Sequence, residues 1–242
     1  MNKKCILLNG VPATGKSASL RNLDPSKILY CNTDGKSEMD FEMEKSFGKF
    51  TTPSDPLQII ASLHAFEESE FEYVVVDTLS EWVDQIEQYY ILPSDDSRGD
   101  WGKVYAASIK ELLNFARLKS SKTWIFISHI EEGGTKNKSA IKGSVGKKGI
   151  EALFSTVLET YTYDLAEENV FGSVIGYGFI AKPTLEHRKT SARSPIGMFP
   201  GKIQNNDLDL VLRRLAGEKI DWDDKEVLFA KDKQLIEKLN NQ

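Results

Sequence analysis

The hydrophobic positions of the N-terminal half of the chain form two alternating patterns. Short, mainly apolar runs of four to six residues are typical of strands buried on both faces of a parallel sheet, and they lie at residues 5–8, 27–31, 71–76 and 123–127. Around them, apolar residues at helical spacing predict amphipathic helices at residues 56–69, 79–92 and 103–119. This alternation predicts an α/β fold with a mostly parallel, twisted sheet flanked by helices.

The C-terminal part of the chain has a different pattern. Residues 156–163 and 174–181 alternate between apolar and polar side chains, which predicts the two strands of a β-hairpin. Asp207 can cap a helix that follows at residues 208–216. Residues 217–242 are charged and weakly apolar, so we expect a peripheral helix with a frayed end there.

Composition adds few constraints. The 242 residues are 40% hydrophobic and 28% charged, and their number suits one core domain, at residues 1–204, with a helical extension at residues 205–242. Cys5 and Cys31 lie in apolar runs, which suits reduced core thiols in a cytoplasmic protein. No run reaches the roughly 18 apolar residues of a membrane span, so we expect no membrane partner. The net charge of −5 leaves only local basic segments to attract nucleic acid.

The most informative motif is Gly-Val-Pro-Ala-Thr-Gly-Lys-Ser at residues 10–17, directly after the first apolar run. A strand, a glycine-bounded loop and a following helix are the context in which GxxxxGK[ST] forms a phosphate-binding loop, or P-loop. Gly10 and Gly15 allow tight turns whose N–H groups point at one anion, and the helix N-terminus adds partial positive charge. The residues expected to hold the nucleotide are Gly10, Val11, Pro12, Ala13, Thr14, Gly15, Lys16, Ser17 and Ala18.

Two side chains of this loop and one distant acid complete the predicted nucleoside triphosphate site. Lys16 would reach the β- and γ-phosphates, and the Ser17 hydroxyl would bind Mg²⁺. The run at residues 71–76 ends in Asp77, as expected of a strand that carries a Walker B carboxylate for the same ion. No acid adjoins Asp77, so the general base must come from elsewhere, and no NKxD-like element is present to select guanine.

Beyond these motifs, the chain resembles the RecA-like ATPases, and among them the small phage-encoded ATPases of recombination and single-strand annealing. The resemblance covers most of residues 1–210 and rests on GVPATGKS at 10–17, ILYCNTD at 28–34, YVVVDTLSEW at 73–82, WIFISHIEE at 124–132, EHRKTSARSP at 186–195 and MFP at 198–200. It implies a RecA-like P-loop NTPase fold with ATP and Mg²⁺ as ligands. The catalytic residues that it implies are Lys16, Asp34, Asp77 and His129.

The resemblance gives two of these residues specific roles. Asp34 matches the acid that orients the attacking water, although RecA proteins usually carry the longer Glu there. A turn-forming residue in Asn32-Thr-Asp-Gly35 explains Asp34 equally well. His129 matches the polar residue that senses the γ-phosphate and passes its presence to the next loop. The alternative is a strand-end histidine that is hydrogen-bonded to the backbone.

Two basic segments follow. The loop at residues 133–149 contains five lysines and five glycines and matches in position the second DNA-binding loop of RecA-like proteins. It lacks aromatic residues for base stacking, so a solvated surface loop is the alternative. The lysines expected to contact DNA phosphates are Lys136, Lys138, Lys142, Lys147 and Lys148. The segment at residues 182–193 follows the hairpin that in RecA-like filaments supplies cations to the neighbour's nucleotide, which makes Lys182, Arg188 and Arg193 candidates for a trans finger, surface charge or DNA contacts.

These observations predict an ATPase that hydrolyses ATP on Mg²⁺ and acts on single-stranded DNA, which would stimulate it, in recombination, annealing or replication. We expect a homo-oligomer, either ring or filament, beside a single-strand binding protein, in the cytoplasm of a bacterial host if the chain is phage-encoded. A helicase-loader-like or assembly ATPase, whose nucleotide only sets conformation, is the main alternative. A P-loop kinase of a small metabolite would need a lid with arginines, and the seven arginines of this chain are mostly scattered.

Overall fold

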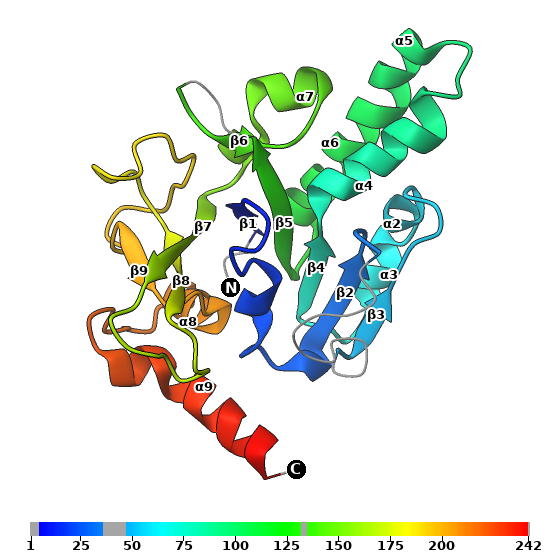
Figure 1. Cartoon of the computed structure of the whole chain (residues 1–242). Helices are drawn as coiled ribbons and strands as arrows, with labels where there is room; N and C mark the ends of the chain where they lie inside the picture. The colour runs from blue at the N-terminus through cyan, green and yellow to red at the C-terminus, as the bar shows by residue number, and fades with distance from the viewer. Residues whose placement is uncertain (1–4, 36–46, 132–134, 242) are drawn as a thin grey trace.

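One twisted sheet forms the centre of the molecule (Figure 1). The computed structural model describes residues 5–35, 47–131 and 135–241, without the side chains of Phe50, Ser144 and Lys148. Eight strands are paired in the order β3-β2-β4-β5-β1-β7-β8-β9, and β6 pairs with β5. The strand bounds are β1 Cys5–Gly10, β2 Ile28–Asn32, β3 Lys49–Thr51, β4 Tyr73–Asp77, β5 Thr123–Glu131, β6 Lys138–Ser139, β7 Thr156–Asp164, β8 Ile175–Ile180 and β9 Lys202–Gln204.

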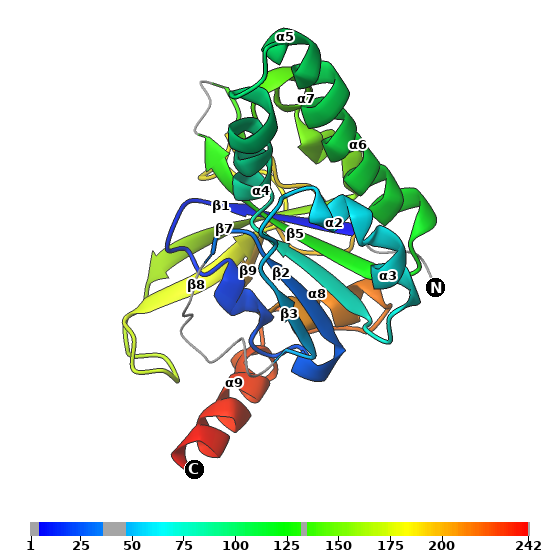
Figure 2. The same ribbon diagram turned by 90° about the vertical axis from the view of Figure 1, so that its right-hand side faces the viewer.

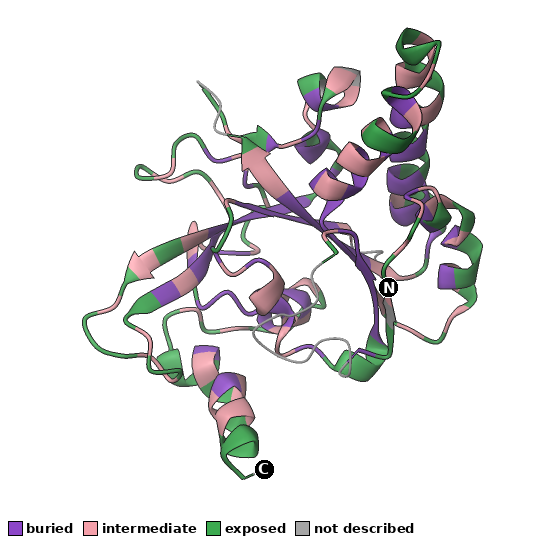
Figure 3. Ribbon diagram, turned by 45° about the vertical axis from the view of Figure 1, so that its right-hand side comes forward, coloured by how far each residue is buried: buried purple, intermediate pink, exposed green. Residues whose placement is uncertain are grey.

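The sheet is parallel from β3 to β7 and antiparallel beyond it. β7 pairs with β8, and β8 with β9, in antiparallel register. The predicted α/β fold with a mostly parallel sheet is therefore confirmed. Successive residues of the central strands face two different hydrophobic clusters, so that Val76 packs in one and Val75 in the other. Burial on both faces explains why these strands are continuous apolar runs (Figure 3).

Helices lie on both faces of the sheet (Figure 2). One face carries α2 Gln58–Ala61, α3 Leu63–Glu68, α4 Leu79–Ile86, which continues as the π-helical turn Glu87–Ile91, and α6 Ala107–Asn114. α6 is preceded by α5 Ser97–Asp100 and the π-helical Trp101–Ala106, and is followed by Phe115–Lys119. The opposite face carries α8 Leu208–Leu215, which Asp207 caps as predicted, and α9 Lys225–Asn240 follows it. None of the helices in the described ranges is long and apolar enough to cross a membrane.

Two local expectations were wrong. The helix expected directly after the P-loop is not a regular α-helix: the chain forms the 3₁₀ turn Ser17–Leu20 and a second 3₁₀ turn at Pro25–Lys27. The lysine-rich segment at residues 133–149 is not a continuous loop, because it contains β6 and α7 Gly143–Lys148 and leads into the 3₁₀ turn Ile150–Leu153. The start of this segment, residues 133 and 134, lies outside the described residues.

Candidate functional site

The predicted nucleotide residues lie where four parallel strands end together. In the β1–β5 pair, Gly10 is next to His129, and in the β4 pairs Asp77 is next to Asn32 on β2 and Ile127 on β5. β1 has β5 on one side and β7 on the other, so the chain crosses from one half of the sheet to the other around β1. Open α/β sheets bind ligands at the carboxyl ends of strands around such a point.

The shape of the P-loop depends on its two glycines. Gly15 has φ +79°, a left-handed conformation that favours glycine. A Cβ atom on Gly10 would lie 1.9 Å from the Thr160 hydroxyl, and one on Gly15 would lie 2.5 Å from Asn206 Nδ2. The loop is therefore packed so closely against β7 and the segment before α8 that neither position accepts a side chain without a shift of its neighbours.

Lys16 lies folded over this loop. Its ammonium group donates hydrogen bonds to the carbonyl oxygens of Gly10, at 3.1 Å, and Val11, at 2.7 Å, and the residue is only 6% exposed. Because the 3₁₀ turn behind the loop has four residues, it supplies little of the helix dipole that the sequence predicted. Lys16 adds a full positive charge beside the loop.

Asp77 joins the P-loop to the neighbouring strands. Its Oδ2 atom accepts hydrogen bonds from the Ser17 hydroxyl and from the Tyr30 hydroxyl, each at 2.5 Å, and the residue is 1% exposed. Burial, and then the charge of Asp77, raise the pKa of Tyr30, so that its hydroxyl stays protonated and remains a donor. Three residues that lie far apart in the sequence thus meet at one carboxylate oxygen.

A second acidic group lies beside Asp77. Asp34 Oδ1 accepts a hydrogen bond from the Thr78 hydroxyl at 2.7 Å, and the N–H groups of Thr33 and Asp34 both donate to the Asp77 carbonyl oxygen. Burial, and then the charge of Asp34, raise the pKa of Glu81 in the first turn of α4. Asp34 is therefore held against the end of β4, close to the first turn of α4.

Sequence reasoning missed Tyr30 and Glu81. Tyr30 carries a hydroxyl between the apolar residues Leu29 and Cys31 of β2, which is the signal that could have identified it. Glu81 lies four residues after Asp77 within the segment YVVVDTLSEW, and what singles it out is its proximity to Asp34, which the sequence does not show.

His129 lies at the same edge. Its backbone N–H donates to the Ser80 hydroxyl at 3.2 Å, and Ser80 in turn donates to the Thr78 hydroxyl at 3.1 Å. These bonds link β5 to the segment that follows Asp77. β5 then continues to Glu131 and pairs with β6, so His129 connects this edge of the sheet to the lysine-rich segment.

Two residues from each of the two predicted basic segments lie together in the structure. Lys136, Lys138, Lys182 and Arg193 line one open hollow of about 620 Å³, which we call the basic hollow. Behind it, the buried Glu159 carboxylate accepts hydrogen bonds from Asn137, at 3.0 Å, and Thr190, at 2.6 Å. Since Glu159 is paired with Asn9 across the β7–β1 register, the basic hollow adjoins the strand that carries the P-loop.

The other predicted cations lie apart from this hollow. Lys142 forms ion pairs with Asp84, at 3.3 Å, and Glu87, at 2.7 Å, so two carboxylates on or next to α4 offset its charge. Lys147 is exposed on α7, and the side chain of Lys148 lies outside the described part. Arg188 is exposed, with its Nε donating to the Leu185 carbonyl oxygen at 3.2 Å.

Chemically, this edge of the sheet combines a glycine-shaped anion cradle, one ammonium group, and a hydroxyl and a carboxylate in contact. Such a set can bind a polyphosphate and a hard divalent cation. Comparison with known proteins adds no family to this description: neither protein-family models nor curated proteins match the chain.

Proposed function

We propose that the chain is a RecA-like P-loop ATPase that binds and hydrolyses ATP with Mg²⁺ and acts on single-stranded DNA in recombination, annealing or replication. The observation that carries this proposal is the 2.5 Å hydrogen bond between Ser17 and Asp77, which are 60 residues apart in the chain. A motif predicted from local spacing and an acid predicted from a strand pattern meet at the carboxyl edge of the sheet. This is the pairing that P-loop NTPases use to hold Mg²⁺.

The residues present fit both ligands. A side chain at Gly10 or Gly15 would collide with neighbouring residues. Because glycine has no side chain, phosphate oxygens can closely approach the backbone there. Ser17 and Asp77 are oxygen donors of the kind that Mg²⁺ prefers, and the described residues contain no cluster of three or more His, Cys, Asp or Glu able to hold a metal. Phosphate oxygens and water would therefore be the remaining ligands. When bound, Mg²⁺ neutralises charge that develops on the phosphates.

The protein side chains then act by position and charge. Lys16 exchanges its bonds to the Gly10 and Val11 carbonyl oxygens for bonds to phosphate, which supplies a charge-assisted contact. Tyr30 fixes the Asp77 carboxylate through its hydrogen bond to Oδ2. Asp34, held by Thr78, orients the attacking water and accepts its proton. No covalent intermediate on the protein is required.

The basic hollow supports the nucleic-acid part of the proposal. It collects Lys136 and Lys138 with Lys182 and Arg193, and it adjoins the P-loop strand through Glu159. Cations gathered in this way suit successive phosphates of a single strand. In a homo-oligomer, Lys182 and Arg193, which both line this hollow, would be the candidate cations for a neighbouring subunit's nucleotide.

One assay separates this function from its competitors. We would measure phosphate release from ATP by the full chain and by Lys16→Ala, with and without single-stranded DNA. The proposal expects Lys16-dependent turnover that DNA increases. Transfer of phosphate to a metabolite would instead indicate a kinase, and binding without turnover an assembly or loader ATPase.

A further inference from the structure

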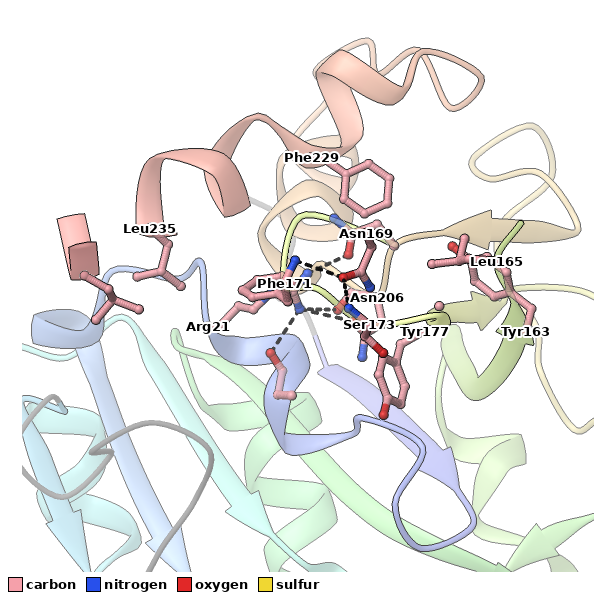
Figure 4. Close-up of a pocket in the computed structure, with 14 residues that line it drawn as sticks. Arg21, Tyr163, Leu165, Asn169, Phe171, Ser173, Tyr177, Asn206, Phe229 and Leu235 are labelled. Carbon is pink, nitrogen blue, oxygen red and sulfur yellow. Dashed lines mark hydrogen bonds between the residues drawn. The ribbon is translucent and has the colours of Figure 1, made fainter. Parts of the chain in front are cut away.

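A second cavity has no lining residue in common with the basic hollow. It has a volume of about 340 Å³ and opens between the turn that follows the P-loop, the hairpin connection between β7 and β8, and α9 (Figure 4). Its apolar walls come from Tyr163, Phe171, Tyr177, Phe229, Leu235 and Leu239. We call it the aromatic cavity.

The aromatic cavity is continuous with the P-loop. Its lining includes Ala18, the residue after Ser17. A Cβ atom on Gly15 would lie 3.1 Å from the Tyr177 ring, so this ring rests against the loop itself. Asn206, another lining residue, donates from Nδ2 to the Gly15 carbonyl oxygen at 2.6 Å. The cavity and the loop at Gly15 to Ser17 thus share Tyr177 and Asn206 as neighbours, and Ala18 follows directly on Ser17.

The polar groups around the cavity are engaged in building its wall. Arg21 binds Asp232 of α9 through two hydrogen bonds, of 2.8 and 3.0 Å, and also donates to the Asn206 side chain at 3.1 Å. Asp232 is fully buried, and Asn205 donates to it at 2.8 Å. This network ties α9 to the turn behind the P-loop and leaves a surface that is mainly apolar and aromatic.

Part of that surface is exposed to water. Phe171 is 49% exposed and Leu239 is 59% exposed, although both line the cavity. The Arg21 guanidinium lies 5.9 Å from the centre of the Phe171 ring, which helps to place the ring over the cavity. A flat aromatic ligand would cover apolar area here and stack on Phe171 or Tyr177.

We propose that the aromatic cavity takes the base and sugar of the nucleotide whose phosphates the P-loop holds. This inference rests on the proposed function, because continuity with the P-loop selects a nucleotide over other aromatic ligands. α9 and the β7–β8 connection, which lie outside the P-loop motif, thereby become part of the nucleotide site. The side chain of a partner protein is the competing occupant.

The test compares ATP with inorganic tripolyphosphate, which has the phosphates without the base. Binding of each to the full chain is measured by calorimetry with Mg²⁺ for wild type, Phe171→Ala and Phe171→Tyr. Phe171→Ala should weaken ATP about tenfold, as expected for the loss of one stacking partner, and leave tripolyphosphate unchanged. Phe171→Tyr should retain ATP affinity. Tyr89→Ala is the matched control, since Tyr89 is 57% exposed on the helix that covers the other face.

Equal effects on both ligands, or no effect on ATP, would overturn the assignment of the aromatic cavity and favour a partner side chain as its occupant. In that case, Lys16-dependent binding of tripolyphosphate would still support the P-loop. If wild type bound neither ligand, the proposed function would fail, and the cavity assignment would fail with it.

Discussion

The edge of the sheet around Ser17 and Asp77, where we propose that the nucleotide binds and which we call the nucleotide edge, is built in the opposite way to the basic hollow. At the nucleotide edge, Ser17, Tyr30 and Asp77 are bonded to one another, and Asp77 is almost completely buried. In the basic hollow, Lys136 and Lys138 are exposed, and the lining side chains are gathered around an open space of about 620 Å³. The first region has a geometry fixed before any ligand binds, whereas the second offers charge without fixed geometry.

This difference decides how each region would act. Fixed groups in a site with little water interact strongly and lose little entropy when a ligand arrives. Exposed cations are screened by salt and act mainly through their number. Single substitutions should therefore have large, specific effects at the nucleotide edge and graded, salt-dependent effects in the basic hollow.

The largest effect is expected for Lys16→Ala. This change removes the ammonium group that lies over the P-loop, so ATP hydrolysis should be abolished and nucleotide binding strongly weakened. Phosphate release and calorimetric ATP binding measure the two effects. Lys103→Ala, which alters a lysine with 74% side-chain exposure, is the control and should change neither. Near-normal turnover in Lys16→Ala would contradict the P-loop assignment.

The next effect concerns the general base. Asp34→Asn should retain ATP binding and lower turnover by roughly 10²–10⁴-fold, as expected when a general base is lost. Steady-state kinetics with parallel binding measurements separate the two quantities. Glu81→Gln sharpens the result, because Glu81 is the nearby acid with a raised pKa. If turnover survives in Asp34→Asn and falls in Glu81→Gln, the base is Glu81 and Asp34 is a turn residue.

A smaller effect is expected for Tyr30→Phe. Without the hydroxyl, Asp77 Oδ2 keeps its bond from Ser17 and loses the second donor that fixes it. The Mg²⁺ concentration for half-maximal turnover should therefore rise by about tenfold, the equivalent of one hydrogen bond to a charged group. Tyr90→Phe is a matched control, since it removes a tyrosine hydroxyl that donates to Asp55 at 2.6 Å, away from this edge. An unchanged Mg²⁺ dependence in Tyr30→Phe would limit Tyr30 to a role in stability.

The smallest effects per residue are expected in the basic hollow. If Lys136 and Lys138 contact DNA phosphates, their replacement by Ala should flatten the slope of log affinity against log salt by roughly 0.7 per lost contact on single strands. A salt titration of single-stranded DNA binding measures this slope. Lys142→Ala should change it little, because Asp84 and Glu87 already offset the charge of Lys142. If the slope of every variant equals that of wild type, these lysines are solvated surface residues that do not contact DNA.

The same contrast explains what the sequence could predict. The α/β fold was predictable because strands buried on both faces leave continuous apolar runs, as at Tyr73–Asp77. The placement of Ser17 beside Asp77 was predictable because each belongs to a local pattern. The hydrogen bond from Tyr30 was not, because it depends on how β2 and β4 pair.

Tertiary contacts also decided the features that local patterns could not show. The sequence allowed a helix after the P-loop, but Arg21 and Asn22 direct their side chains to Asp232, and only a 3₁₀ turn forms. The aromatic cavity joins Ala18, Phe171 and Phe229, which no spacing rule connects. The glycines of the lysine-rich segment suggested a loop. Instead, Gly143 is the first residue of α7 and Gly149 follows its last residue, and both have positive φ.

The central claim is that Ser17 and Asp77 together hold the Mg²⁺ that accompanies ATP. The most direct measurement is a double-mutant cycle, in which Mg²⁺-dependent ATP binding is titrated for wild type, Ser17→Ala, Asp77→Asn and the double variant. We predict that each single change weakens Mg²⁺-dependent binding and that the double variant is scarcely weaker than the worse single one. Fully additive losses, or ATP binding by wild type that does not depend on Mg²⁺, would contradict the account.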